Sequence, residues 1–103
     1  MLNDFWVGVL RLDLAIPGAR SRKDRRQVIK SLKERIQSRF QVACAEVGDL
    51  DTWTRASLGV TACANEREHL EEVLGEIERY ARNDPGALLG NIERESFRFG
   101  ELA

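Results

Sequence analysis

The stretch from Phe5 to Leu14 constrains the fold of this sequence more than any other part of it. It begins as an apolar run and then alternates strictly, with leucine at every second position from Leu10 onward and charged residues between. A period of two predicts a β-strand with one buried face and one open face. Pro17 and Gly18 follow and predict a turn at the end of this strand.

Two helices and three further strands are predicted after this turn from the spacing of apolar residues. Ser21 is expected to cap the first helix, and Asn65 with Glu68 is expected to form a capping box for the second. The predicted helices cover residues 22–39 and 65–82, the predicted strands cover 40–47, 53–64 and 88–98, and a loop covers 48–51.

The order strand-helix-strand-strand-helix-strand consists of two βαβ halves in tandem. This order predicts a ferredoxin-like α+β sandwich, a βαββαβ fold with an antiparallel sheet in the strand order 4-1-3-2 and both helices on one face. With 103 residues the chain has the length of a single domain, which we expect to span residues 1–103.

One face of the predicted sheet has no helix to cover it. About half of the side chains that the alternation places on this face are apolar. That is a larger apolar area than a monomer usually exposes to water. We therefore expect a homodimer through this face, with Val7, Val9, Arg11, Val42 and Arg55 as candidate interface residues. The full predicted set is Phe5, Val7, Val9, Arg11, Val42, Cys44, Glu46, Arg55, Ser57 and Thr61, and Trp6 joins it if Gly8 hosts a bulge.

The sequence offers little from which to build a catalytic or metal centre. A regular hairpin would place Cys44 and Cys63 about 27 Å apart, so the prediction is two small, buried, reduced thiols. His69 stands alone on the second helix and is expected to be solvated. No glycine-rich loop has phosphate-binding spacing. We therefore expect no catalytic residue, no metal site and no cofactor.

Charge is distributed unevenly along the chain. Residues 1–39 carry ten Lys and Arg against four Asp and Glu, whereas residues 40–103 carry six against thirteen. Such asymmetry indicates a surface that faces a polyanion, an association between unlike faces, or simply a basic solvated helix. The candidate nucleic-acid-binding residues, which a phosphate backbone would match, are Arg20, Arg22, Lys23, Arg25, Arg26 and Lys30.

Composition also bears on the class of protein. The chain is 43% hydrophobic and 32% charged, as is typical of soluble globular domains. No apolar run approaches the ~20 residues of a membrane span, and Asp4 precedes the longest run, which argues against a secretory signal. A cytoplasmic protein without a membrane partner is expected.

Two groups of motifs resemble the YlxP-like family, a bacterial domain of unknown function 503. The first comprises residues 7–14, the Ile-Pro-Gly-Ala-Arg-Ser run of 16–21 and the basic run of 23–26. The second comprises residues 45–47 and 51–60. The resemblance implies a ferredoxin-like fold and a bacterial cytoplasmic protein. It also implies genes that often neighbour those for translation initiation and ribosome maturation factors, and it brings no catalytic residues.

Three hypotheses for function follow. The leading one is a non-catalytic accessory protein that associates with RNA or with a ribosomal particle through the basic first helix. The alternative is an oligomeric module that binds a small ligand or regulates another protein, with open sheet faces paired between subunits. An enzyme is the weakest of the three, because the chain lacks a convincing set of acid, base or metal-binding residues.

Overall fold

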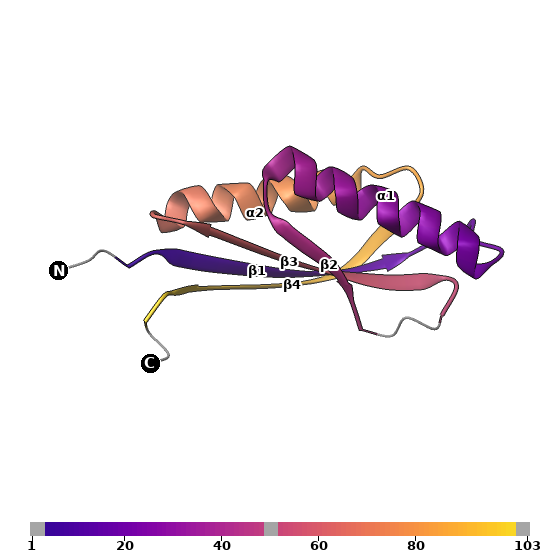
Figure 1. Cartoon of the computed structure of the whole chain (residues 1–103), viewed down its shortest axis with the longest axis horizontal. Helices are drawn as coiled ribbons and strands as arrows, with labels where there is room; N and C mark the ends of the chain where they lie inside the picture. Colours follow the sequence, from indigo (N-terminus) through magenta and orange to yellow (C-terminus); the bar gives the residue numbers. More distant parts are fainter. Residues whose placement is uncertain (1–3, 49–51, 101–103) are drawn as a thin grey trace.

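The structure is a computed structural model that describes residues 4–48 and 52–100. Figure 1 shows a sheet with two helices lying side by side along one of its faces. The elements in chain order are β1 (Trp6–Ala15), α1 (Arg22–Phe40), β2 (Ala43–Val47), β3 (Arg55–Ala64), α2 (Arg67–Arg82) and β4 (Leu88–Arg98). Residues 49–51 of the predicted loop 48–51 lie outside the described residues.

The sheet has four strands in the order β2-β3-β1-β4, and every neighbouring pair is antiparallel. Both helices cover the same face, with α1 over β2 and β3, and α2 over β1, β3 and β4. This arrangement confirms the predicted ferredoxin-like topology. The molecule is elongated, with extents of 54 × 25 × 20 Å, because its strands and helices run along one axis (Figure 1).

The core lies between the sheet and the two helices. Side chains of β1, β3 and both helices form its central layer, and all of them are buried except Val73, which is partly buried and packs against the others. They are Leu10, Leu12, Ile29, Leu32, Leu58, Val60, Val73 and Ile77.

Trp6 and Gly8 lie on the helix-covered face, because β1 alternates without interruption against β3 from Trp6 to Ala15. A Cβ on Gly8 would come within 2.8 Å of a Leu74 methyl group, so a larger residue here would force the Leu70 and Leu74 side chains of α2 to shift. The irregularity in β1 lies elsewhere, between Leu12 and Leu14 in the pairing with β4. The suggested bulge at Gly8 is therefore absent from this part of the structure.

The predicted orientation of β2 is wrong. Cys44 pairs with Val60 and Glu46 pairs with Leu58, and directly paired residues share a face of the sheet. Cys44 and Glu46 therefore point toward the helices, as Val60 and Leu58 do. The physical reason is that α1 continues to Phe40 and Gln41 adopts a left-handed conformation (φ 54°), which starts β2 later and fixes its register.

The helix starts differ in how they are capped. The Ser21 side chain accepts a hydrogen bond from the Asp24 backbone N–H at 3.1 Å, which confirms the predicted cap of α1. The N-cap of α2 is Glu66, without a side-chain hydrogen bond, so the predicted capping box at Asn65 is wrong. Helix α2 accordingly begins at Arg67, one residue later than a cap at Asn65 would place its start.

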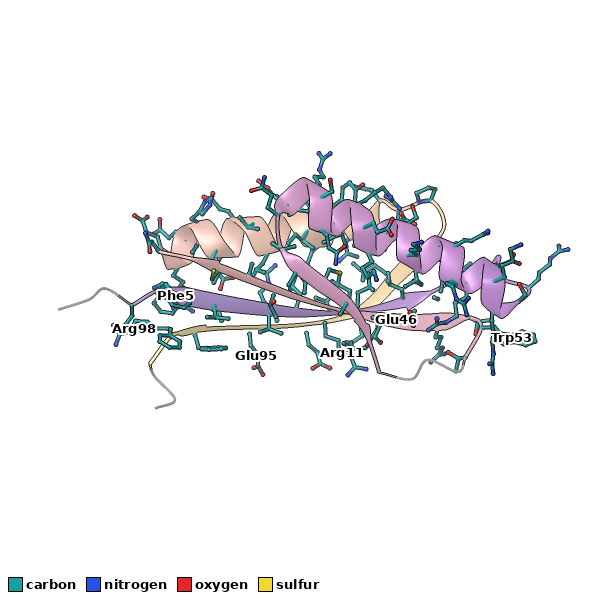
Figure 2. All side chains as sticks on the ribbon, in the orientation of Figure 1. Phe5, Arg11, Glu46, Trp53, Glu95 and Arg98 are labelled. Carbon is teal, nitrogen blue, oxygen red and sulfur yellow. The ribbon has the colours of Figure 1, made fainter. Side chains whose placement is uncertain are left out.

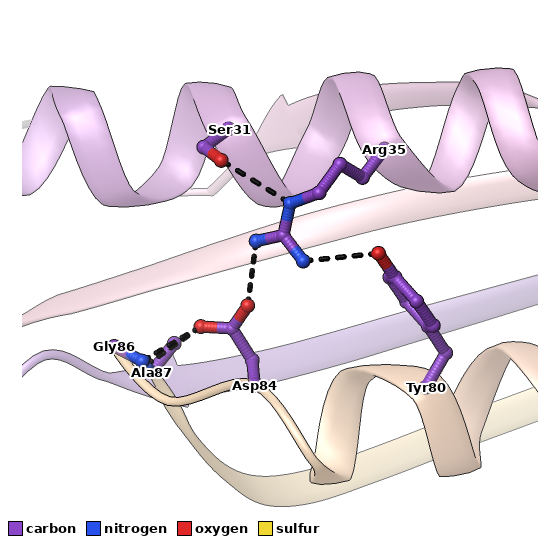
Figure 3. Close-up of polar contacts among 6 residues, drawn as sticks. All are labelled: Ser31, Arg35, Tyr80, Asp84, Gly86 and Ala87. Carbon is purple, nitrogen blue, oxygen red and sulfur yellow. Dashed lines mark hydrogen bonds and ion pairs between the residues drawn. The ribbon is translucent and has the colours of Figure 1, made fainter.

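A polar cluster joins α1 to the turn after α2 (Figure 3). The side chain of Asp84, 2% exposed, accepts hydrogen bonds from the backbone N–H groups of Gly86 and Ala87. Arg35 donates to the same carboxylate at 2.6 Å and to the Tyr80 hydroxyl at 3.0 Å. This cluster fixes the end of α2 and the start of β4 beneath α1.

Candidate functional site

Five of the six predicted nucleic-acid-binding residues form a basic stripe at the start of α1. They are Arg20, Arg22, Lys23, Arg26 and Lys30, and all five are exposed. Lys23, Arg26 and Lys30 follow one another at spacings of three and four residues, which places them on one side of the helix. Lys30 has a weak surface ion pair with Glu34 at 3.9 Å. The stripe therefore presents a row of cations to solvent.

Arg25, the sixth predicted residue, is not part of the stripe. Its side chain is 7% exposed and forms an ion pair with Glu46 on β2. Its Nε atom also donates to the Arg55 carbonyl oxygen at 3.0 Å. Arg25 therefore ties α1 to β2 and β3, and its guanidinium is not available to a phosphate.

Trp53 is an exposed aromatic residue near the stripe that the sequence analysis did not select. It is 50% exposed in the segment that leads into β3, and Figure 2 shows it at the same end of the molecule as the start of α1. Two hydrogen bonds hold this segment, from Ile16 N–H to the Thr54 carbonyl at 2.7 Å and from Arg25 to Arg55. Trp53 was predicted to be the first residue of the strand 53–64, but β3 begins at Arg55, so Trp53 lies outside the strand.

Acidic side chains gather at the opposite end of the molecule, because α1 and α2 run in opposite directions (Figure 1). Glu66, Glu68, Glu72 and Glu76 are exposed along α2. By contrast, Glu71 and Glu78 are bound by Arg94 of β4 at 2.9 and 2.5 Å. The pKa of Glu71 is lowered mainly by the hydrogen bond from Ser96 and next by the hydrogen bond from Arg94. The basic stripe and the exposed carboxylates of α2 thus lie toward opposite ends of the molecule.

The open sheet face carries four of the five candidate interface residues. The register of β1 and β3 places Val7, Val9, Arg11 and Arg55 on the side away from the helices, and Figure 2 shows Arg11 and Glu95 projecting from that side. Val42 instead packs against the core cluster, so its predicted place on this face is wrong. The reason is the register of β2 described above.

Apolar side chains occupy one end of this face. Val7 pairs with Phe97 across β1 and β4, and just beyond them Phe5 stacks on Phe99 with ring centroids 4.9 Å apart. Phe99 is 56% exposed. The contribution of β4 to this apolar end was not predicted, because the sequence could not give the register of an edge strand.

Polar side chains occupy the other end of the face, centred on Asp13. Its carboxylate accepts hydrogen bonds from Ser57 at 2.6 Å, Arg11 at 3.0 Å and Asn91 at 3.4 Å. These hydrogen bonds lower the pKa of Asp13, and the hydrogen bond from Ser57 has the largest effect. Together with Arg55 these residues line a shallow hollow of about 580 Å³.

The two cysteines lie on opposite faces of the sheet and are free thiols. Cys44 is buried, and burial raises the pKa of its thiol to about 11. Cys63 is exposed, so the prediction of two buried thiols is wrong for Cys63. The register also places Cys63 only three positions from the partner of Cys44, much nearer than the 27 Å expected. His69 is exposed on α2, as predicted.

In the described part of the chain no group of three or more His, Cys, Asp or Glu side chains is placed to hold a metal ion. Across the same residues, neither helix is long and apolar enough to cross a membrane.

The comparisons with known proteins identify a family. A family described as a protein of unknown function, DUF503, matches residues 7–94. An uncharacterised protein, YlxP from Bacillus subtilis, is 34% identical over 71 residues, which cover 69% of this chain and 77% of that protein.

Two solved structures resemble the fold. The designed protein Foldit4 has a TM-score of 0.53 at 16% identity, over 90% of this chain and 96% of that one. A dimeric ferredoxin-like protein from an uncultured marine organism has a TM-score of 0.46 at 12% identity, over 90% and 85% of the two chains. At these identities the likeness to Foldit4 concerns the fold alone.

Proposed function

The chain belongs to the DUF503 family of proteins of unknown function, and we propose that it is a non-catalytic accessory protein that binds RNA or a ribosomal particle through the basic stripe of α1. The observation that carries this proposal is the stripe itself, five exposed cations at one end of an elongated molecule. The exposed acidic residues of α2 lie toward the other end, which gives the molecule a defined orientation in the field of a polyanion.

The chemistry of the stripe fits a phosphate backbone better than it fits an isolated small anion. Its cations are spread along two turns of helix instead of converging on one point, and contacts of this kind position a protein without reading sequence. Trp53 adds an exposed aromatic surface at the same end of the molecule (Figure 2). Such residues stack on unpaired bases, each stack contributing about 1–3 kcal/mol. A single-stranded or looped RNA segment is therefore the expected target.

A double charge reversal tests the proposal. Lys23→Glu combined with Arg26→Glu removes two phosphate contacts, so binding to ribosomal subunits and to single-stranded RNA weakens across sequences. In fluorescence anisotropy, the slope of log affinity against log salt becomes shallower by about 1.5. Both side chains are exposed near the helix N-terminus, where glutamate interacts favourably with the helix dipole, so the fold is retained.

The control is Arg79→Glu combined with Arg82→Glu, which makes the same change in net charge on α2. It reduces binding only slightly, because these residues lie outside the stripe. Circular dichroism during heating verifies that both variants are folded. Equal binding by wild type and the Lys23/Arg26 variant, or equal loss in both double variants, contradicts the proposal.

The hollow on the open sheet face favours a second candidate function, the binding of a small ligand. Arg11, Arg55 and Asp13 offer charges of both signs there, and Ser57 and Asn91 offer hydrogen-bonding groups. If the protein acts by binding a ligand in this hollow, its function does not depend on the cations of the stripe. Failure of the charge-reversal experiment therefore favours this candidate over RNA binding.

A further inference from the structure

We infer that the open sheet face is the interface of a symmetric homodimer, with a two-fold axis that runs parallel to the strands. This inference concerns the side of the sheet away from the helices and does not rest on the proposed RNA function. Three features of the face carry it: its area, its apolar end and the distribution of its charges.

The area is sufficient for a stable pair. Three strands of 10 or 11 residues and β2 of 5 residues, spaced by ~4.8 Å with ~3.4 Å per residue, offer roughly 590 Å² on one copy. Two copies would then bury about 1,200 Å², which lies at the lower end of the range of specific interfaces. The helices already cover the other face, so this is the one broad face of the sheet that is left for a partner.

The apolar end of the face fixes the direction of the axis. It contains Phe5, Val7, Val9, Phe97 and Phe99, with Glu95 beside Val9 on the edge strand β4, whereas the polar end contains Arg11, Asp13, Ser57 and Arg55. An axis across the strands would place the apolar end of one copy over the charged end of the other. An axis parallel to the strands places like ends together, which buries apolar against apolar surface and leaves the polar ends to pair with each other.

The charges of the face complement one another under this symmetry. Arg11 and Glu93 occupy the same level of the sheet, because they are paired residues of β1 and β4. An axis parallel to the strands keeps levels aligned, so Arg11 of one copy lies at the level of Glu93 of the other. With the two sheets fully overlapped, β1 of one copy lies over β3 of the other, so the two residues are about 10 Å apart across the sheet. Arg11 of each copy is thus attracted to Glu93 of the other without touching it, and this attraction occurs twice.

Sedimentation equilibrium over a wide range of protein concentration tests the inference. The wild-type mass rises toward twice 11.7 kDa as concentration increases. Val9→Arg introduces a charge in the apolar end and remains monomeric at every concentration. The matched control is Gln27→Arg on the exposed side of α1, which dimerises as wild type does. Circular dichroism confirms that each variant is folded.

A second pair of variants tests the direction of the axis and does not depend on Val9. Glu93→Arg alone, or Arg11→Glu alone, brings like charges together and weakens the dimer by about tenfold or more. An equimolar mixture of these two variants restores dimers, because each hybrid pair contains only opposite charges. A wild-type monomer at the highest concentration, or a Val9→Arg protein as dimeric as wild type, overturns the interface. A mixture that stays monomeric overturns the axis.

Discussion

At the scale of single residues, the two cysteines report on the register of the β2–β3 hairpin. The thiolate is the reactive form of cysteine, and burial with a pKa of about 11 keeps Cys44 protonated at neutral pH. In dilute native protein we therefore expect iodoacetamide to modify Cys63 and to leave Cys44 intact until the chain is unfolded. Mass spectrometry of the tryptic peptides measures both sites, and Cys63→Ser is the control that takes up no label when native. Rapid labelling of Cys44 in the folded protein would contradict its placement beneath the helices.

At the scale of elements, Asp84 holds the junction of α2 and β4 beneath α1 (Figure 3). Asp84→Ala leaves two backbone N–H groups and part of the Arg35 guanidinium without their acceptor. We expect it to lower the free energy of unfolding by about 2–4 kcal/mol, measured by urea denaturation.

The comparison variant for this junction is Arg35→Ala, which leaves Asp84 with its two backbone donors. It should be the milder change, since the Arg35 side chain is 41% exposed and water can replace part of what it donates. If Asp84→Ala costs no more than Arg35→Ala, the backbone N–H groups are not the main partners of the carboxylate.

At the scale of the whole molecule, the stripe and the open face lie on opposite sides of the sheet (Figure 1). Their functions should therefore be separable. We expect Val9→Arg to change the sedimenting mass and to leave the salt slope of RNA binding per chain unchanged. The Lys23/Arg26 double reversal should do the opposite. If either variant changes both measurements, the two surfaces are coupled and the separation drawn here is wrong.

The sequence was sufficient to predict an element where neighbouring residues differ strongly in polarity. Leucine alternates with charge from Leu10 to Leu14, so only one face of β1 can be buried without burying Arg11 and Asp13. Ser21 followed by apolar residues at helical spacing similarly defines α1. Local contrast of this kind fixed the order of elements, and the short connections between them left few ways to arrange the strands. The exposed cations of the stripe also followed from helical spacing alone.

Only the tertiary structure decided the orientation of side chains whose contacts lie far away in the sequence. Residues 42–47 have small or apolar side chains on both faces, so their alternation could not choose between them. The choice came from register with β3, and it turned Glu46 inward because Arg25, 21 positions away, supplies the opposite charge there. The same ion pair removed Arg25 from the basic stripe. A charged residue is buried when another element brings its partner, and the pattern of the surrounding sequence does not contain that information.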